Sequence, residues 1–75
     1  MEILFFGSLV DETTVSNIKL VTASDMDELI QILCKRYPGL VNAKYFIAVN
    51  EKMIQGNTAL HLNDIVALMP PFSGG

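Results

Sequence analysis

One segment near the middle of the sequence has every mark of a helix and so constrains how the remaining residues can fold. Ser24 is a suitable N-cap, and acidic residues at positions 25, 27 and 28 lie in the first turn, where the helix dipole favours negative charge. Pro38-Gly39 ends the segment. Between these ends, apolar residues recur at helical spacing along one face: Met26, Leu29, Ile30, Leu33, Cys34 and Tyr37. The sequence therefore predicts one amphipathic helix whose apolar face needs a partner layer.

Short apolar runs on both sides of that helix predict the partner layer. β-branched and aromatic residues dominate these runs, and turn-forming residues separate them, among them Gly7, Asn50-Glu51-Lys52 and Asn63-Asp64. The first two runs are close enough in sequence to pair as an antiparallel hairpin. The predicted strands are residues 1–7, 15–22, 44–50, 53–55 and 65–69. This order predicts an α+β fold, in which one helix packs across a mixed sheet of about five strands.

The length of the chain limits it to one small domain, because it has only 75 residues. A chain of this size buries about 60% of its unfolded surface, so it has no room for a deep active-site cleft beside its core. Charged residues make up 17% of the sequence, against about 25% in typical soluble domains. Such a surface exposes apolar area, which indicates a binding partner.

Charge and the scarcity of metal ligands exclude several classes of protein. The net charge of -3 argues against nucleic-acid binding, which needs a basic surface. The longest apolar runs are far shorter than the roughly 18 residues of a membrane span, and no signal peptide is visible. Cys34 is the one cysteine and His61 the one histidine, so neither an internal disulfide nor a zinc site is expected. We therefore expect a cytoplasmic protein that binds no membrane, metal or cofactor.

Alternation along the predicted strands places apolar residues on both faces of the sheet. The residues expected to face the helix are Ile3, Phe5, Ile47, Val49, Val66 and Leu68. The opposite face ought to be polar if it met only solvent, yet it would carry Leu4, Phe6, Phe46, Ala48, Ala67 and Met69. Two interpretations stay open. Either loops cover some of these residues, or they form a docking surface to which Met53 and Met69 add adaptable contacts.

The C-terminal segment is the most unusual part of the sequence. Pro70 lacks a backbone donor and ends strand pairing after Met69, and Pro70-Pro71 stiffens the chain as it leaves the domain. Residues 70–75 can reach about 20 Å when extended. Gly74-Gly75 has no side chains and can pass through a passage too narrow for any other dipeptide. The alternative is a terminal segment without any role.

With this order of strands and helix, the segment resembles the small subunits of molybdopterin synthase, a family of ubiquitin-like β-grasp sulfur carriers. The resemblance spans nearly the whole chain and rests on four stretches. They are Ile3-Leu4-Phe5-Phe6-Gly7, Ala48-Val49-Asn50, Asp64-Ile65-Val66-Ala67 and the terminal Pro70-Pro71-Phe72-Ser73-Gly74-Gly75. It implies a β-grasp domain over residues 1–69 and a flexible, sulfur-carrying tail over residues 70–75.

The resemblance implies a carrier without catalytic groups of its own. An ATP-dependent adenylyltransferase similar to ubiquitin-activating enzymes would adenylate the carboxylate of Gly75, beside Gly74, and sulfur would then displace AMP to leave a thiocarboxylate. The large, catalytic subunit of molybdopterin synthase would receive the tail in its active site. There the sulfur would pass to cyclic pyranopterin monophosphate and build the dithiolene of molybdopterin. The expected assembly is a heterotetramer around a dimer of large subunits.

The same resemblance implies which residues contact the large subunit. On the sheet these are Phe6 and Met69, which lie on the face that alternation predicts to be apolar, and Met53, which is expected to add contacts to it. Along the tail they are Pro70, Pro71, Phe72 and Ser73. The chemistry and the docking surface are thus expected to be neighbours.

Three other functions are compatible with the same pattern. A thiazole sulfur carrier of thiamine synthesis shares the fold but usually ends in Gly-Gly without Pro-Pro. A ubiquitin-like protein modifier would be joined through Gly75 to lysines of its targets. A plain interaction module would use the domain with no tail chemistry.

Two stretches depart from the family pattern. Where family members often carry Arg-Glu soon after the first strand, this chain has Val10-Asp11-Glu12-Thr13, without the arginine. Where they commonly have Asp-Gly-Asp before the last strand, it has Leu62-Asn63-Asp64, and Asn63 is expected to take the left-handed conformation of the glycine. Of the remaining residues of interest, Cys34 is expected to be a buried core thiol and Tyr45 a half-buried strand residue.

Overall fold

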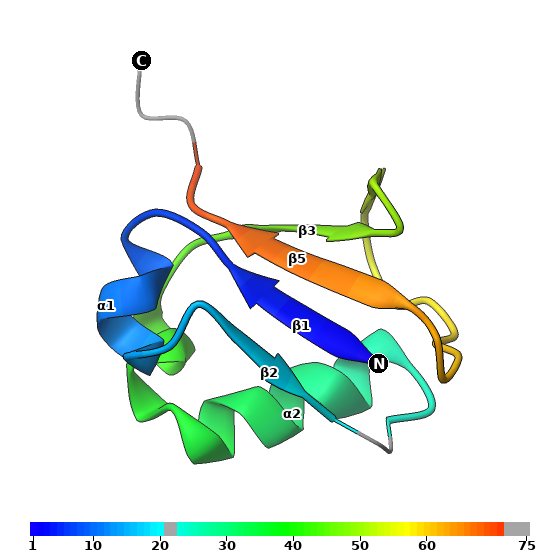
Figure 1. Ribbon diagram of the computed structural model, residues 1–75, viewed down its shortest axis with the longest axis horizontal. Coiled ribbons are helices and arrows are strands. Elements are labelled where there is room, and N and C mark those ends of the chain that lie inside the picture. Colours follow the sequence, from blue (N-terminus) through cyan, green and yellow to red (C-terminus); the bar gives the residue numbers. More distant parts are fainter. Residues whose placement is uncertain (21–22, 72–75) are drawn as a thin grey trace.

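The computed structural model describes residues 1–20 and 23–71 of the chain as one five-stranded sheet with one main helix (Figure 1). The strand order is β2-β1-β5-β3-β4. In chain order the elements are β1 (Glu2–Phe5), α1 (Leu9–Thr13), β2 (Asn17–Lys19), α2 (Met26–Arg36), the 3₁₀ helix η1 (Pro38–Asn42), β3 (Phe46–Val49), β4 (Lys52–Ile54) and β5 (Ile65–Met69). This is the α+β architecture that the sequence predicts.

The first and last strands pair in parallel at the centre of the sheet. β1 and β5 are parallel over four residue pairs, from Glu2 opposite Ile65 to Phe5 opposite Leu68. The other pairings, β1 with β2, β3 with β5 and β3 with β4, are antiparallel. The sheet is therefore mixed, and the first two strands form the expected hairpin.

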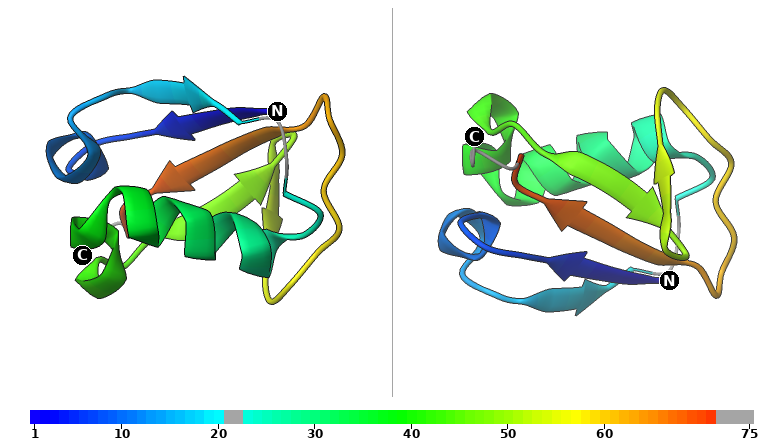
Figure 2. Two further views of the ribbon diagram at one scale, coloured as in Figure 1. Left: turned by 90° about the horizontal axis from the view of Figure 1, so that it is seen from below. Right: turned by 90° about the horizontal axis from the view of Figure 1, so that it is seen from above.

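The core lies between the sheet and α2, which crosses one face of the sheet (Figure 2). Along β1 and β5, every second side chain points toward the helix. These side chains have 0–2% of their surface exposed. The buried residues of these three elements are Ile3, Phe5, Val66 and Leu68 from the strands and Met26, Leu29 and Leu33 from the helix. Within the described residues, no helix lies over the opposite face of the sheet (Figure 2).

The start of α2 differs by one residue from the prediction. Asp25, and not Ser24, is the N-cap: its backbone is extended, and its carboxylate accepts a hydrogen bond from the backbone N–H of Glu28 at 2.9 Å. The Glu28 carboxylate in turn accepts from the backbone N–H of Ser24 at 2.6 Å. The two acidic side chains thus accept hydrogen bonds from backbone N–H groups at the start of the helix, one on each side of the N-cap. Ser24 lies just before the N-cap.

Two short helices lie where the sequence predicts only connections. α1 buries Leu9 and Thr13, and the Thr13 hydroxyl donates to the backbone carbonyl of Val15 at 2.7 Å. η1 buries Leu40. Each helix has five residues, so neither is long enough to show a repeating apolar face in the sequence.

Most predicted strands are longer than the observed ones. The last strand has the predicted bounds, the first, second and third each lack three described residues of the predicted range at their ends, and the fourth begins and ends one residue earlier. Val21 and Thr22, at the end of the predicted second strand, lie outside the described residues. The predicted ends carry apolar residues that pack against the core outside the observed strands, as Val15, Leu20 and Tyr45 do.

The turns before β4 and before β5 are both formed where the sequence predicts them, but the second lacks the conformation expected for Asn63. Asn50 and Glu51 have φ values of 51° and 71°, so a two-residue turn of the primed type joins β3 to β4. Asn63 is absent from the non-glycine residues with positive φ in the described chain, so the left-handed conformation expected for it is wrong. Hydrogen bonds to Asp64 shape that turn instead, because its carboxylate accepts from the backbone N–H of His61.

Candidate functional site

The side of the sheet that faces away from α2 carries the apolar residues expected from alternation. The strand register shows how they are arranged. One row runs across four strands through Leu4, Ala67, Ala48 and Met53, each opposite the next. Nearer the end of the chain, Phe46 lies opposite Met69, and Phe6 continues β1 beside it because its N–H donates to the carbonyl of Leu68 at 3.1 Å. We call these residues, together with Ile65, the apolar face: Leu4, Phe6, Phe46, Ala48, Met53, Ile65, Ala67 and Met69.

Four large side chains of the apolar face are exposed. Phe6 and Phe46 each have 47% of their surface accessible, Met53 has 59% and Ile65 has 44%. Leu4, Ala67 and Met69 are half-buried, and Ala48 is buried. The face therefore has a shallow centre of two alanines with larger side chains around it. Among the described residues, Phe6, Phe46, Met53 and Ile65 thus stay accessible, which favours the docking interpretation over coverage by loops; docking itself stays a prediction.

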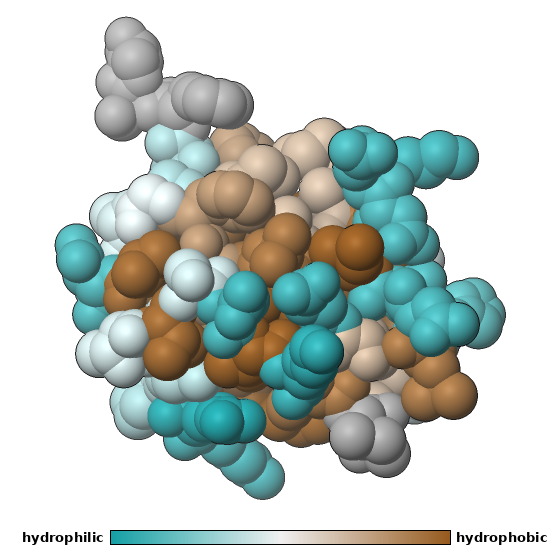
Figure 3. Space-filling view, viewed as in Figure 1, coloured by the Kyte–Doolittle hydropathy of each residue, from teal (hydrophilic) through white to brown (hydrophobic). Residues whose placement is uncertain are grey.

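A space-filling view shows the same concentration of apolar atoms. Hydrophobic surface crosses the middle of the molecule over β1 and β5, with hydrophilic surface beside it (Figure 3). Around the rim lie charged residues of both signs: Glu2 lies opposite Lys19 across β1 and β2, and Glu51, in the turn into β4, lines one pocket with Leu4 and Ile65. An apolar centre within a polar rim is the arrangement found at protein–protein interfaces.

The tail root, which we define as Met69, Pro70 and Pro71, leaves the domain at the edge of the apolar face. Because β1 and β5 are parallel, their carboxyl ends meet at the same edge of the sheet, and Phe6 and Pro70 follow them there. Pro70 is half-buried and Pro71 is exposed. Of the residues predicted for the site, Phe6, Met53 and Met69 thus share the side of the sheet that faces away from α2, and Pro70 leaves the sheet beside them. Phe72, Ser73, Gly74 and Gly75 lie outside the described residues.

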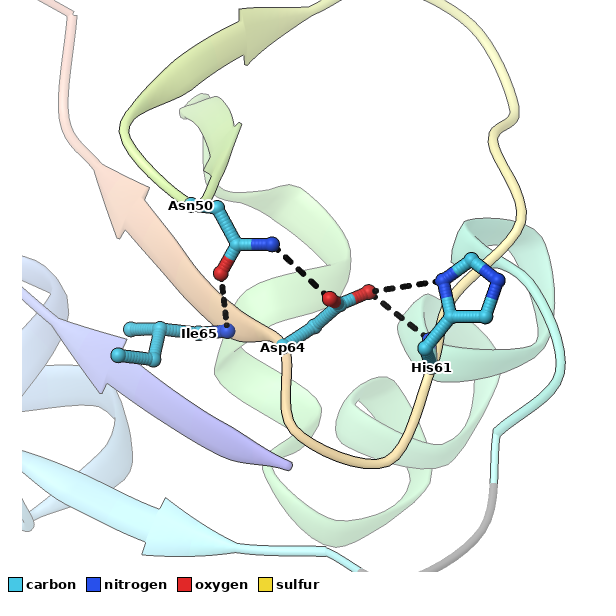
Figure 4. Close-up of polar contacts among 4 residues, drawn as sticks. All are labelled: Asn50, His61, Asp64 and Ile65. Carbon is cyan, nitrogen blue, oxygen red and sulfur yellow. Dashed lines mark hydrogen bonds and ion pairs between the residues drawn. The ribbon is translucent and has the colours of Figure 1, made fainter.

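At the other end of β5, a network of hydrogen bonds fixes the turn between β3 and β4 against the start of β5 (Figure 4). The side-chain amide of Asn50 donates to the Asp64 carboxylate at 2.9 Å, and its carbonyl oxygen accepts from the backbone N–H of Ile65 at 3.0 Å. The second Asp64 oxygen accepts from the backbone N–H of His61 at 2.8 Å. The bond from Asn50 and then the bond from His61 hold the pKa of Asp64 below its ordinary value. This network supports the amino end of the apolar face.

Among the described residues, the other reactive side chains do not gather into a second site. Cys34 was expected to be buried but is half-buried, because it lies toward the edge of the helix face that packs on the core. Burial and the neighbouring Cys34 thiol raise the pKa of Tyr45, which is half-buried as predicted. His61 is mostly exposed and lies 3.6 Å from the Asp64 carboxylate.

Residues 1–20 and 23–71 contain neither a metal-binding cluster nor a membrane-spanning helix. In that part of the chain, no group of three or more His, Cys, Asp or Glu side chains is placed to hold a metal ion. Over the same residues, no helix combines the length and the apolar character needed to cross a bilayer.

Sequence reasoning missed Ile65 as a member of the apolar face. The signal was present, because Ile65 is two residues before Ala67 on a strand whose bounds were predicted correctly. The cross-strand rows could not have been found in the same way, because they depend on register.

Comparisons with known proteins agree with this geometry. The model of the ThiS family matches residues 3–75. Among solved structures, a chain of the protein–protein complex of subunits 1 and 2 of molybdopterin-converting factor from Helicobacter pylori 26695 is similar to this chain at 31% sequence identity and a TM-score of 0.72. The match covers 99% of this chain and 96% of that chain. These similarities confirm the ubiquitin-like β-grasp fold predicted from the sequence.

Proposed function

The chain belongs to the ThiS family, and on that basis we propose that it is the sulfur-carrying small subunit of a molybdopterin synthase. In this role Gly75 bears a thiocarboxylate, whose sulfur passes to cyclic pyranopterin monophosphate to form the molybdopterin dithiolene. The similarity to a chain of the two-subunit molybdopterin-converting factor supports this function over others open to the fold. The domain over residues 1–69 then serves to be recognised, and residues 70–75 serve as the carrier.

One observation of the structure supports the proposal most strongly: the apolar face and the tail root are continuous. Phe6 and Met69 lie side by side at the edge of the sheet where Pro70 leaves it. A partner that covers the apolar face therefore has the start of the tail directly beside its contact surface. A large subunit that binds there is in position to take the rest of the tail into its own active site.

The chemistry proposed for the tail needs activation from outside. A carboxylate is a poor electrophile, so the Gly75 carboxylate first attacks the α-phosphate of ATP on a separate adenylyltransferase, and pyrophosphate leaves. A sulfide equivalent then attacks the acyl carbon, AMP leaves, and the thiocarboxylate remains. Each loaded terminus carries one sulfur atom. ATP is thus a substrate of the activating enzyme and not a cofactor of this chain.

We propose that the catalytic groups belong to the large subunit. The face beside the tail root is made of apolar side chains. They can bind a partner and exclude water from the contact, but they cannot transfer protons. We further propose that the two kinds of subunit form a heterotetramer in the cytoplasm. Binding and presentation are the contributions of this chain.

Intact-mass spectrometry tests the proposal directly. The protein is purified from its native host, grown with ample sulfur and with the activating enzyme present. We expect a fraction in which one oxygen at Gly75 is replaced by sulfur, located by fragmentation of the C-terminal peptide. A terminus that stays a carboxylate under these conditions would contradict the carrier function.

Two further measurements separate the related functions. Copurification with a subunit that converts the pyranopterin precursor identifies the molybdopterin pathway, whereas copurification with thiazole-forming enzymes would identify the thiamine carrier. A series of conjugates through Gly75 to lysines of other proteins would instead identify a protein modifier. The similarity to molybdopterin-converting factor leads us to expect the first result.

A further inference from the structure

Gly7 and Pro70 are in close contact where the tail leaves the sheet. Gly7 has a φ of +56°, in the left-handed region, and turns the chain from β1 toward α1. A Cβ atom placed on Gly7 would lie 2.9 Å from Cγ and 3.4 Å from Cδ of Pro70. The first distance is shorter than side-chain carbons approach one another. The proline ring therefore occupies the space that any other residue at position 7 would fill.

This contact joins the tail root to the apolar face. Phe6, an exposed member of the face, directly precedes Gly7, and its N–H donates to the carbonyl of Leu68 in β5. Pro70 follows β5 after Met69, and its ring fixes its own φ near -65°. Since the ring also rests on the Gly7 backbone, the direction in which the chain leaves β5 is set relative to Phe6.

We propose that Gly7 is a positioning residue for sulfur transfer: by accepting the Pro70 ring, it directs the tail toward the partner's active site when Phe6 is docked. The inference rests on the proposed carrier function and adds to it. Gly7 touches neither the sulfur nor the acceptor and acts through Pro70. Pro71 inherits its starting direction from this contact.

Gly56 provides a matched control for the backbone conformation. It also has a positive φ, of +76°, but no atom lies within 4 Å of the position its Cβ would take. Gly7→Ala and Gly56→Ala therefore impose the same left-handed strain on an alanine. Only Gly7→Ala also displaces Pro70.

The test compares four variants of the full chain, all loaded with thiocarboxylate and corrected for the loaded fraction by mass spectrometry. They are Gly7→Ala, Gly56→Ala, Pro70→Ala and the double variant Gly7→Ala/Pro70→Ala. Single-turnover sulfur transfer is measured at saturating large subunit, and the dissociation constant for that subunit is measured separately. Thermal denaturation of each variant reports the shared cost of strain. NOE cross-peaks between the Gly7 Hα and the Pro70 ring protons report the contact itself.

We expect Gly7→Ala to slow transfer about tenfold or more, since small misplacement of reacting groups has effects of that size. Its dissociation constant should stay within about threefold of the parent, and its melting temperature should match that of Gly56→Ala. Gly56→Ala should transfer at the parental rate. In the Pro70→Ala background, where no ring meets the new methyl group, Gly7→Ala should change the transfer rate less than about twofold.

Either of two results would overturn the inference. Equal transfer rates for Gly7→Ala and Gly56→Ala would show that the contact does not direct the tail. A loss of transfer that persists in the Pro70→Ala background, together with an equal loss of affinity, would show a structural role alone. The NOE measurement decides whether the contact exists whatever the sulfur chemistry proves to be. Failure of the carrier function shows itself separately, as an unmodified Gly75 in the parent protein.

Discussion

Single residues at the two ends of β5 have different tasks. At its amino end, Asp64 accepts hydrogen bonds from the Asn50 amide and from the backbone N–H of His61, and so connects two turns. At its carboxyl end, Met69 and Pro70 lead from the apolar face into the tail. The first group stabilises the sheet and the second belongs to the surface that we propose for recognition, so substitutions at the two ends should have separable effects.

Asp64→Asn should destabilise the domain at neutral pH and remove part of its pH dependence. The folded pKa of Asp64 is lowered, so its contribution is present above the unfolded value near 3.8 and is lost as the pH falls through the folded value. The lost charge-assisted bonds predict a cost of about 1 kcal/mol at neutral pH. Urea unfolding of both proteins at neutral pH and below pH ~3 measures the difference, which should shrink in acid. Glu51→Gln, which removes an exposed carboxylate outside the helices, is the control; an equal, pH-independent cost in both variants would contradict this account.

Phe6→Asp should weaken binding to the large subunit far more than it lowers the stability of the fold. Phe6 is exposed in the free chain, so a charge there stays solvated and should change the free energy of unfolding by about 0.5 kcal/mol or less. In the complex the charge would be desolvated within the contact surface, and we expect the dissociation constant for the large subunit to rise about thirtyfold or more. Calorimetric titration measures it. Leu62→Asp, at an even more exposed apolar residue in the turn before β5, is the matched control and should leave binding unchanged.

Among the elements, the turn between β3 and β4 combines a fixed geometry with an unfavourable residue. Both of its central residues have positive φ, which a hairpin of this type requires, but the second is glutamate and not the usual glycine. Asn50 tolerates the conformation and is held by its bonds to Asp64 and Ile65. Glu51 is exposed at the rim of the apolar face.

Glu51→Gly should therefore stabilise the protein by about 1 kcal/mol, because glycine adopts this conformation without the Cβ penalty. The free energy of unfolding in urea measures the gain. Asn50→Gly, the neighbouring change in the same turn, should have the opposite sign, since it removes the side-chain bonds to the start of β5. A loss of stability in Glu51→Gly would show that the glutamate side chain makes a contribution larger than its strain.

The elements differ in how far the sequence determines them. α2 and β5 were predicted well because their signals are local: capping residues, a repeating apolar face and a β-branched run between turn residues. α1 and η1 were not predicted, because each buries only one or two residues, and their helical form depends on packing against each other and the core. The shift of the α2 N-cap from Ser24 to Asp25 has a similar cause: Asp25 also bridges to Ala59, a contact that sequence alone does not reveal.

The candidate site was predicted in its residues but not in its arrangement. Alternation identified Phe6 and Met69, and the terminal motif identified the tail. The neighbourhood of Phe6, Met69 and Phe46 arises from the parallel register of β1 with β5 and the antiparallel register of β3 with β5. The Gly7–Pro70 contact arises from the same register, extended beyond the strand ends. Such long-range pairings lie outside what local patterns can determine.

At the scale of the whole molecule, the surface that we propose for docking and the terminus that we propose for sulfur transfer lie in different parts of the chain. The core extends from Ile3 to Leu68, and the described chain after Met69 leaves the sheet. The apolar face belongs to the folded domain, whereas the proposed chemistry is confined to the last residue of the sequence. Removing the chemistry should therefore leave the recognition surface intact.

A chain without Gly74 and Gly75 should act as a competitive inhibitor of sulfur transfer. It keeps the core and the apolar face, so its melting temperature and its affinity for the large subunit should be close to those of the full chain. Added to loaded full-length protein, it should reduce the rate by occupying the large subunit, with an inhibition constant near its dissociation constant. The same truncation with Phe6→Asp should not inhibit. Failure of the truncated chain to compete would place the main binding energy in the tail instead of the sheet.

The parallel pairing of β1 with β5 also has a consequence for synthesis of the protein. β5 is the central strand of the sheet, yet it is the last of the five to be translated. Until β5 leaves the ribosome, the strand that joins β1 to β3 is missing. The sheet is then incomplete and cannot pack on α2. The nascent chain must therefore wait in an open state that chaperones can bind, and it acquires its fold only when the residues just before the tail have emerged.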